Sequence, residues 1–268
     1  MNKTRQLVIE KIAENVRAEC NVTDYGFQNI FEAAEKAGYR VIRYPIGKES
    51  FLGFALIKDT ERIIFSNSSC ILSREVFSIA HEIGHQKLHL SEQGRTMIKD
   101  DDFNDRDENE IEANYFAACL LMPRDKVDKF IRLELNEKKA DTWNGLDIAR
   151  IQTMFSVSYD MVIIRLKALN LLGEPLFDKL KLEKLEKTAT NLLKAINGNA
   201  DLCKPTEAKK VPAEYLDWVI SNYNDKLIPM KSLEVALSYV DINAEDFESQ
   251  AEGFEEDESL DDLLKGMD

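Results

Sequence analysis

Apolar residues recur along the first part of the chain at two periods, one helical and one extended. A helix is predicted at the start, because four apolar residues follow one another at roughly helical spacing: Leu7, Ile9, Ile12 and Val16. A second helix is predicted over residues 27–37, with Gly38 closing it. Residues 39–44, 51–57 and 62–65 are rich in Val, Ile, Phe and Tyr and are separated by turn sequences, so we expect a small antiparallel sheet.

All of the strand signal lies before residue 70. Ser73 is the predicted N-cap of a helix that runs through His89. Residues 105–122 predict another helix, which Pro123 stops. A few strands followed by a run of helices are typical of an α+β fold, in which helices pack on one small sheet.

The remainder of the chain divides into three parts. Residues 146–172 have the pattern of a helix, a short turn and a second helix capped by Ser158, and they complete a first domain of residues 1–172. Residues 173–244 predict an all-helical C-terminal region. Residues 245–268 carry 11 acidic residues and one Lys, so we expect an acidic, disordered tail. An inhibitory strand over a cleft and a mimic of DNA are the other interpretations of this tail.

The net charge indicates which classes of binding partner are unfavourable. Lys and Arg total 35 against 49 Asp and Glu, which gives a net charge of −14. Such a chain is repelled by nucleic acid and by anionic membranes. Residues 146–170 have a net charge of only +1, whereas a helix-turn-helix that binds DNA needs a basic face. We therefore expect this segment to support the core or to dock a protein, and we do not favour direct nucleic-acid binding.

Two further features predict a cytoplasmic protein. The longest apolar run, residues 116–122, is far shorter than the ~20 residues of a membrane-spanning helix, and the start lacks the apolar stretch of a secretory signal. The four cysteines form no Cys-x-x-Cys pair, so we expect them to be reduced core residues.

All three histidines of the chain lie within nine residues, at positions 81, 85 and 89. The first two belong to the sequence His-Glu-Ile-Gly-His. Residues four apart share one face of a helix, so the imidazoles of His81 and His85 can bind one ion. Glu82 then projects beside the metal, where it can take a proton from metal-bound water. This arrangement is typical of a zinc-dependent hydrolase.

The third ligand has to come from another part of the chain. His89 lies about 6 Å further along the helix axis than His85, so we interpret it as a residue that supports the site and not as a ligand. No other histidine is present, which favours a carboxylate from the next helix. We favour Glu110 over Glu108 and Glu112; all three are otherwise explained as acids that stabilise a helix N-terminus. Asn114 shares a face with Glu110 and is expected to hydrogen-bond a ligating histidine, whereas Glu112 is expected to face elsewhere.

Three stretches of the sequence match the pattern of a known family. They are residues 74–89, which include the histidine motif, residues 110–123, and Phe-Ser-Val-Ser at 155–158 followed by Arg165-Leu. Together they resemble the ImmA/IrrE family of metallopeptidases over about two thirds of the chain, to residue 172. The resemblance implies a zincin-like, gluzincin-type zinc peptidase with Zn²⁺ on His81, His85 and Glu110, and with Glu82 as the catalytic base.

The resemblance also implies a biological role. Members of this family typically cleave or control a helix-turn-helix transcriptional repressor of a mobile element or a stress response, and some relatives act in toxin–antitoxin-like pairs. We therefore expect a zinc metallo-endopeptidase with such a repressor as its substrate. The alternative is a non-proteolytic protein that binds a regulator through a degenerate peptidase fold.

Overall fold

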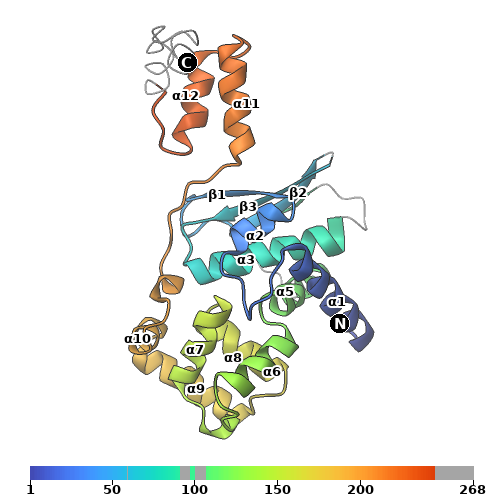
Figure 1. Ribbon diagram of the computed structural model, residues 1–268, viewed down its shortest axis with the longest axis vertical. Coiled ribbons are helices and arrows are strands. Elements are labelled where there is room, and N and C mark those ends of the chain that lie inside the picture. The colour runs from blue at the N-terminus through green and yellow to red at the C-terminus, as the bar shows by residue number, and fades with distance from the viewer. Residues whose placement is uncertain (59, 91–96, 100–106, 245–268) are drawn as a thin grey trace, which may run out of the picture. The chain divides into compact units, whose positions relative to one another are not determined.

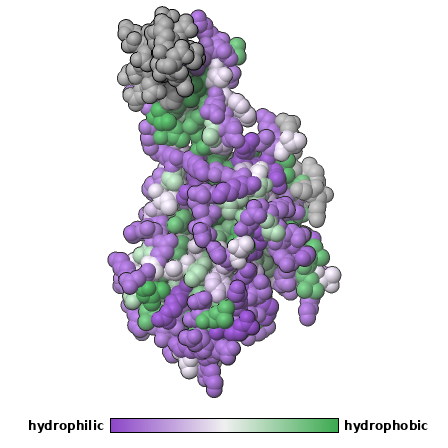
Figure 2. Space-filling view, in the orientation of Figure 1, coloured by the Kyte–Doolittle hydropathy of each residue, from purple (hydrophilic) through white to green (hydrophobic). Residues whose placement is uncertain are grey.

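The chain forms two compact units, Met1–Ala208 and Lys209–Asp268. The computed structural model describes residues 1–58, 60–90, 97–99 and 107–244 (Figure 1). The predicted acidic tail, residues 245–268, lies outside the described residues. Hydrophilic side chains cover most of the visible face of the first unit (Figure 2). No helix in the described part of the chain combines the length and the apolar character that crossing a membrane requires.

The first two predicted helices are confirmed. Helix α1 spans Lys3–Glu19 and α2 spans Ile30–Lys36. Asparagine side chains cap both helices, since Asn2 accepts a hydrogen bond from the Arg5 amide and Asn29 accepts from the amides of the first turn of α2. The buried face of α1 differs from the prediction at Leu7, whose side chain is exposed and takes no part in the core.

The fold class is α+β, as predicted, but the sheet is mixed and not purely antiparallel. Its four strands lie in the order β1-β3-β2-β4. They are β1 (Tyr39–Tyr44), β2 (Gly53–Lys58), β3 (Glu61–Asn67) and β4 (Met97–Lys99). Strand β1 pairs in parallel with β3, while β2 pairs antiparallel with β3 and β4. Residues 45–52 connect β1 to β2, and β3 pairs between these two strands. The sequence could not predict the parallel pairing, because alternating apolar residues do not encode the direction of a strand. The short strand β4 was not predicted.

Helix α3 (Leu72–His85) lies between the sheet and helix α5 (Glu108–Leu121). Its cap differs from the prediction, because Ile71 precedes the helix and Ser73 is buried within the first turn. The chain continues from His85 into one wider turn of π-helix, η1 (Gln86–Leu90). The prediction of α5 is confirmed: the Asp107 side chain caps its start and the helix ends before Pro123.

A buried ion pair anchors α3 to the sheet. Glu75 in the first turn of α3 has a fully buried side chain, and both of its carboxylate oxygens accept hydrogen bonds of 2.7 Å from Arg43 of β1. The Arg43 guanidinium stacks 3.7 Å from the centre of the Phe31 ring. Residues 204–208 pass over the start of α3, where the Leu72 amide donates a hydrogen bond to the carbonyl of Lys204. These contacts fix the start of the helix that carries the histidines.

The rest of the first unit is helical. The pattern predicted for residues 146–172 is confirmed as two helices, with Ser156 in the left-handed conformation between them and Ser158 capping the second. Two later helices, α9 and α10, also belong to this unit and contact α7 and α8. The elements after α5 are α6 (Arg124–Leu133), η2 (Ala140–Thr142), α7 (Gly145–Phe155), α8 (Tyr159–Ala168), α9 (Glu174–Lys187), α10 (Ala189–Ala195) and η3 (Ala200–Cys203).

The second unit contains a pair of helices in its described part, α11 (Ala213–Asn224) and α12 (Met230–Ser238). Its core is small and is built on Leu233, Leu237 and Ala244. Trp218 on α11 stays largely exposed, as expected for a helical pair with so little apolar surface to cover it.

Candidate metal centre

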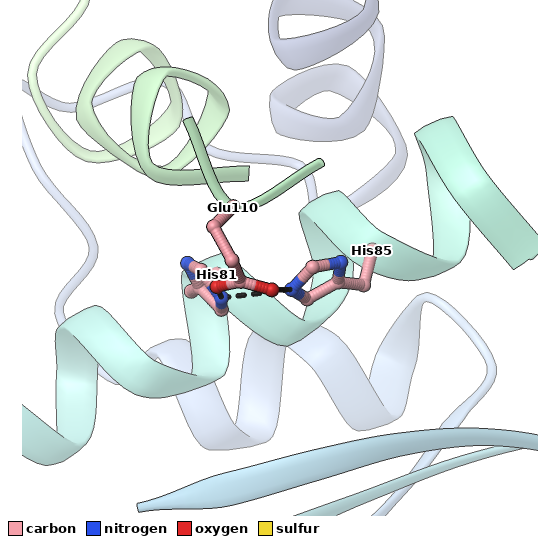
Figure 3. A group of neighbouring side chains, drawn as sticks. All are labelled: His81, His85 and Glu110. Carbon is pink, nitrogen blue, oxygen red and sulfur yellow. Dashed lines mark hydrogen bonds and ion pairs between the residues drawn. The ribbon is translucent and has the colours of Figure 1, made fainter. Parts of the chain in front are cut away.

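Three side chains from two helices converge at the interface of α3 and α5. His81 and His85 lie one turn apart on α3, and Glu110 reaches them from the first turn of α5 (Figure 3). The Nε2 atom of His81 lies 3.1 Å from Glu110 Oε2, and the Nε2 atom of His85 lies 3.1 Å from Glu110 Oε1. The two Nε2 atoms are 2.8 Å apart. The structure therefore brings together the residues expected as ligands.

The three donors fit a metal ion. Their ligand atoms all lie within 4.8 Å of one another, and both histidines are buried. Two ligands at the usual zinc distances of a tetrahedral site lie roughly 3.3–3.4 Å apart. The observed separations are a few tenths of an ångström shorter, so the donors already point at one common position. Two imidazoles and one carboxylate also form a donor set that is common in catalytic zinc sites.

Hydrogen bonds on the other ring nitrogens orient the two histidines. Asn114, one turn after Glu110, places its Oδ1 atom 3.0 Å from His81 Nδ1. An amide oxygen only accepts, so Nδ1 of His81 carries a proton, which leaves Nε2 as the ring atom that can bind an ion. His85 Nδ1 lies 3.0 Å from His89 Nδ1. Asn114 and His89 thus stand where the sequence predicted supporting residues.

His89 lies between the metal donors and a second carboxylate, Glu112. His89 lies in the wider turn of π-helix, η1, and its Nδ1 atom lies 3.0 Å from Nδ1 of His85. The Nε2 atom of His89 faces away from the three donors and lies 3.4 Å from Glu112 Oε2. Glu112 also accepts hydrogen bonds from Arg5 of α1 at 2.8 and 2.6 Å.

Sequence reasoning missed Arg5. Glu112 points away from the metal donors, as expected, but its contact with His89 ties it to the site. Arg5 lies 107 positions before Glu112, and no local spacing links the two. Glu108, the other carboxylate considered as a ligand, is exposed at the start of α5 and takes no part in the cluster.

Glu82 lies on the side of α3 that faces the sheet. Its side chain is fully buried, and the start of β2 passes close to it at Gly53. A Cβ atom at Gly53 would lie 3.0 Å from Glu82 Oε1 and 2.8 Å from Ser78 Oγ. A glycine is therefore needed where the strand approaches the carboxylate. Glu82 is adjacent to His81 but is not one of the three converging donors.

The local electrostatics favour an ionised carboxylate at Glu110. Burial alone raises the pKa of Glu110, but hydrogen bonds from His81 and His85 outweigh it and hold this pKa far below its ordinary value. Burial lowers the pKa of His89 to about 4, and the neighbouring His85 adds to this effect while Glu112 opposes it. The hydrogen bond from Arg5 lowers the pKa of Glu112.

The comparisons with known proteins agree with this geometry. The model of the IrrE N-terminal-like domain, peptidase family M78, matches residues 34–167, which is half of the chain. The chain belongs to this family. The matched residues include α3 and α5 with all three donors, whereas α1 and its Arg5 lie before the match. The first unit is therefore a peptidase-like domain with a cluster that could hold a metal.

One curated relative comes from a bacteriophage. The chain is 27% identical over 125 residues to the protein called "Uncharacterized immunity region protein 2" of Bacillus phage phi105. The aligned region covers 47% of this chain and 78% of the phage protein. The likeness thus extends over most of that relative.

The close contact between α3 and α5 predicts the effect of a bulkier residue at Gly84. A Cβ atom there would lie 2.9 Å from Phe116 Cδ1 and 3.3 Å from the Cα atom of Ala113. We expect Gly84→Val to lower the free energy of unfolding by about 1–3 kcal/mol, since overpacking forces the helices apart. It should also weaken metal binding, because Glu110 moves with α5. Urea unfolding and metal titration measure both effects.

A matched control for this variant is Gly173→Val. A Cβ atom at Gly173 would meet nothing closer than 3.9 Å, so the added side chain has room. Equal losses of stability in the two variants would contradict the explanation by helix contact.

Proposed function

We propose that this protein is a zinc-dependent metallo-endopeptidase. His81, His85 and Glu110 hold the ion, and Glu82 acts as the general base. The observation that carries the proposal is the convergence of three donors from α3 and α5, one of which, His81, is followed directly in the sequence by the buried carboxylate of Glu82. Three protein donors instead of four are typical of catalytic sites, because a position is left for water or substrate.

Different residues of the chain bind the ion, transfer the proton and orient the histidine rings. A zinc ion held by the three donors supplies a Lewis acid that polarises the scissile carbonyl and acidifies water. Glu82 takes the proton of the attacking water on a carboxylate oxygen and passes it to the leaving amine. Asn114 and His89 hold the rings of His81 and His85 in the orientation that presents Nε2 to the ion.

We propose a helix-turn-helix transcriptional repressor as the substrate, in a mobile element, a stress response or a toxin–antitoxin-like pair. Membership of the IrrE N-terminal-like family and the likeness to a phage immunity region protein support this choice. The net charge of −14 also supports it, because DNA-binding proteins present basic surfaces that attract an acidic partner. A cytoplasmic location, where such a repressor resides, stays a prediction.

The exposed surface of the helix pair α7–α8 favours a role in packing over direct contact with DNA. The exposed positions of α8 are Asp160, Ile164 and Ala168, and none of them is basic. Lys184 of α9 forms an ion pair with Asp160. Phosphate binding needs several Lys or Arg side chains on one face.

Capture of the natural substrate tests the proposal. The full-length Glu82→Gln variant and wild type are purified from the native cell, and mass spectrometry identifies every captured protein and its termini. We expect a regulator that is intact with the variant and cut beside wild type, with equal zinc content in both preparations. A partner that stays intact with both proteins would contradict proteolysis and favour the regulator-binding alternative.

A further inference from the structure

A chain of hydrogen bonds links the metal centre to the first helix of the protein. It starts at His85, whose Nδ1 lies 3.0 Å from His89 Nδ1. His89 Nε2 lies 3.4 Å from Glu112 Oε2, and Arg5 binds both oxygens of Glu112. The rings of His85 and His89 are buried, while Glu112 and Arg5 are partly exposed. Four residues from four elements, α3, η1, α5 and α1, thus form one connected line of hydrogen bonds.

The donors and acceptors along this line fix its direction. A guanidinium only donates and a carboxylate only accepts, so Glu112 cannot donate to His89. Nε2 of His89 must therefore carry a proton, and Nδ1 of the neutral ring then has a lone pair. That lone pair accepts from Nδ1 of His85. With an ion between the three donors, His85 would bind it through Nε2, so its proton would lie on Nδ1 and be donated along this line.

We propose that Arg5, Glu112 and His89 are positioning residues that hold His85 in the tautomer a metal ion requires. The inference rests on the proposed function, since it concerns the same site. It assigns to α1, which lies before the family match, a part in metal binding. Asn114 performs the same task for His81 with one hydrogen bond, whereas His85 depends on a line that ends at the protein surface.

A purely structural interpretation is that Arg5 and Glu112 only fasten α1 to α5. The chain offers a control for this, because a second hydrogen bond joins the same helices: Tyr115 donates to Glu10 at 2.5 Å. Tyr115→Phe removes this fastening and leaves Glu112 and His89 untouched. If the role is only structural, Glu112→Ala and Tyr115→Phe should change zinc affinity equally. If Glu112 positions His89 and His85, only Glu112→Ala should weaken zinc binding.

The protonation of the histidines can be observed directly. The chain has only three histidines, so a long-range ¹H–¹⁵N correlation spectrum of the full-length, zinc-loaded protein contains three imidazole patterns. We expect His81 and His85 to carry their protons on Nδ1 and His89 to carry its proton on Nε2. A proton on Nδ1 of His89 would overturn the proposal.

Zinc affinity supplies the second readout, measured by competition with a chelator. Loss of an outer hydrogen-bond partner typically weakens metal binding by about 10–100-fold, which we expect for Glu112→Ala. Glu112→Gln keeps an acceptor for His89 and should restore most of the affinity, and Tyr115→Phe should bind zinc as tightly as wild type. Equal affinity of Glu112→Ala and wild type would overturn the positioning role.

The two proposals fail in different ways. If wild type binds no zinc, the proposed function is wrong, and the His89 pattern in the metal-free protein still tests the line of hydrogen bonds. If wild type binds zinc but Glu112→Ala and Tyr115→Phe weaken binding equally, the metal site stands and the line has only a structural role.

Discussion

Replacement of Glu82 by glutamine is expected to lower kcat/KM for peptide-bond hydrolysis by about 10²–10⁴-fold, the usual contribution of a general base. The amide has nearly the shape of the carboxylate but does not accept a proton from water. Glu82 is not one of the three converging donors, so the variant should still bind one zinc ion per chain. The rate is measured on the protein that wild type is found to cut, and zinc is measured by elemental analysis.

Glu10→Gln is the control for this variant. It makes the same change from carboxylate to amide on α1, where Glu10 is exposed and binds Tyr115. We expect it to cleave at the wild-type rate. A Glu82→Gln protein that cleaves as fast as the control would contradict the assignment of the base. A variant that loses its zinc would show that Glu82 supports the site in another way.

Removal of the Glu75 side chain is expected to lower the free energy of unfolding by about 3–5 kcal/mol, as is usual when one partner of a buried ion pair is lost. The Glu75 side chain has no exposed surface, and that of Arg43 is only 13% exposed. Glu75→Ala leaves the guanidinium buried against Phe31 without its carboxylate. Ser66 and Thr206, each 3.3 Å from a Glu75 oxygen, lose a partner as well.

Tryptophan fluorescence during urea unfolding measures this loss. The chain has two tryptophans, of which Trp143 is buried in the first unit and Trp218 is exposed in the second, so a Trp218→Phe background reports on the first unit. Glu14→Ala is the control, because its ion pair with Lys11 is exposed and should contribute little. A loss in Glu75→Ala no larger than in this control would contradict the role of the pair.

A double variant separates the cost of a lone buried charge from the net value of the pair. Arg43→Met combined with Glu75→Leu replaces the pair by apolar side chains of similar size, and such exchanges are often close to neutral. We therefore expect it to recover much of the stability that Glu75→Ala loses. Such a recovery would mean that the ion pair adds little net stability to the fold. Its main role would then be to fix the position of α3, two turns before Glu82.

The sequence by itself determined the features that depend on neighbours along the chain. The four-residue spacing of His81 and His85 places both rings on one face of any helix, and Glu82 follows from the same motif. Local apolar periods and breakers likewise predicted α1, α5 and the pair α7–α8, because these signals lie within a few residues of the helix ends.

The tertiary structure decided what depends on how the elements pack. Glu110 and not Glu108 faces the histidines because the close contact at Gly84 sets the register of α5 on α3. The parallel pairing of β1 with β3 follows from the path of the chain between strands. The approach of Arg5 to Glu112 joins two residues that are 107 positions apart and share no local spacing. A sequence encodes such contacts only through the whole fold, because their partners are brought together by packing and not by local spacing.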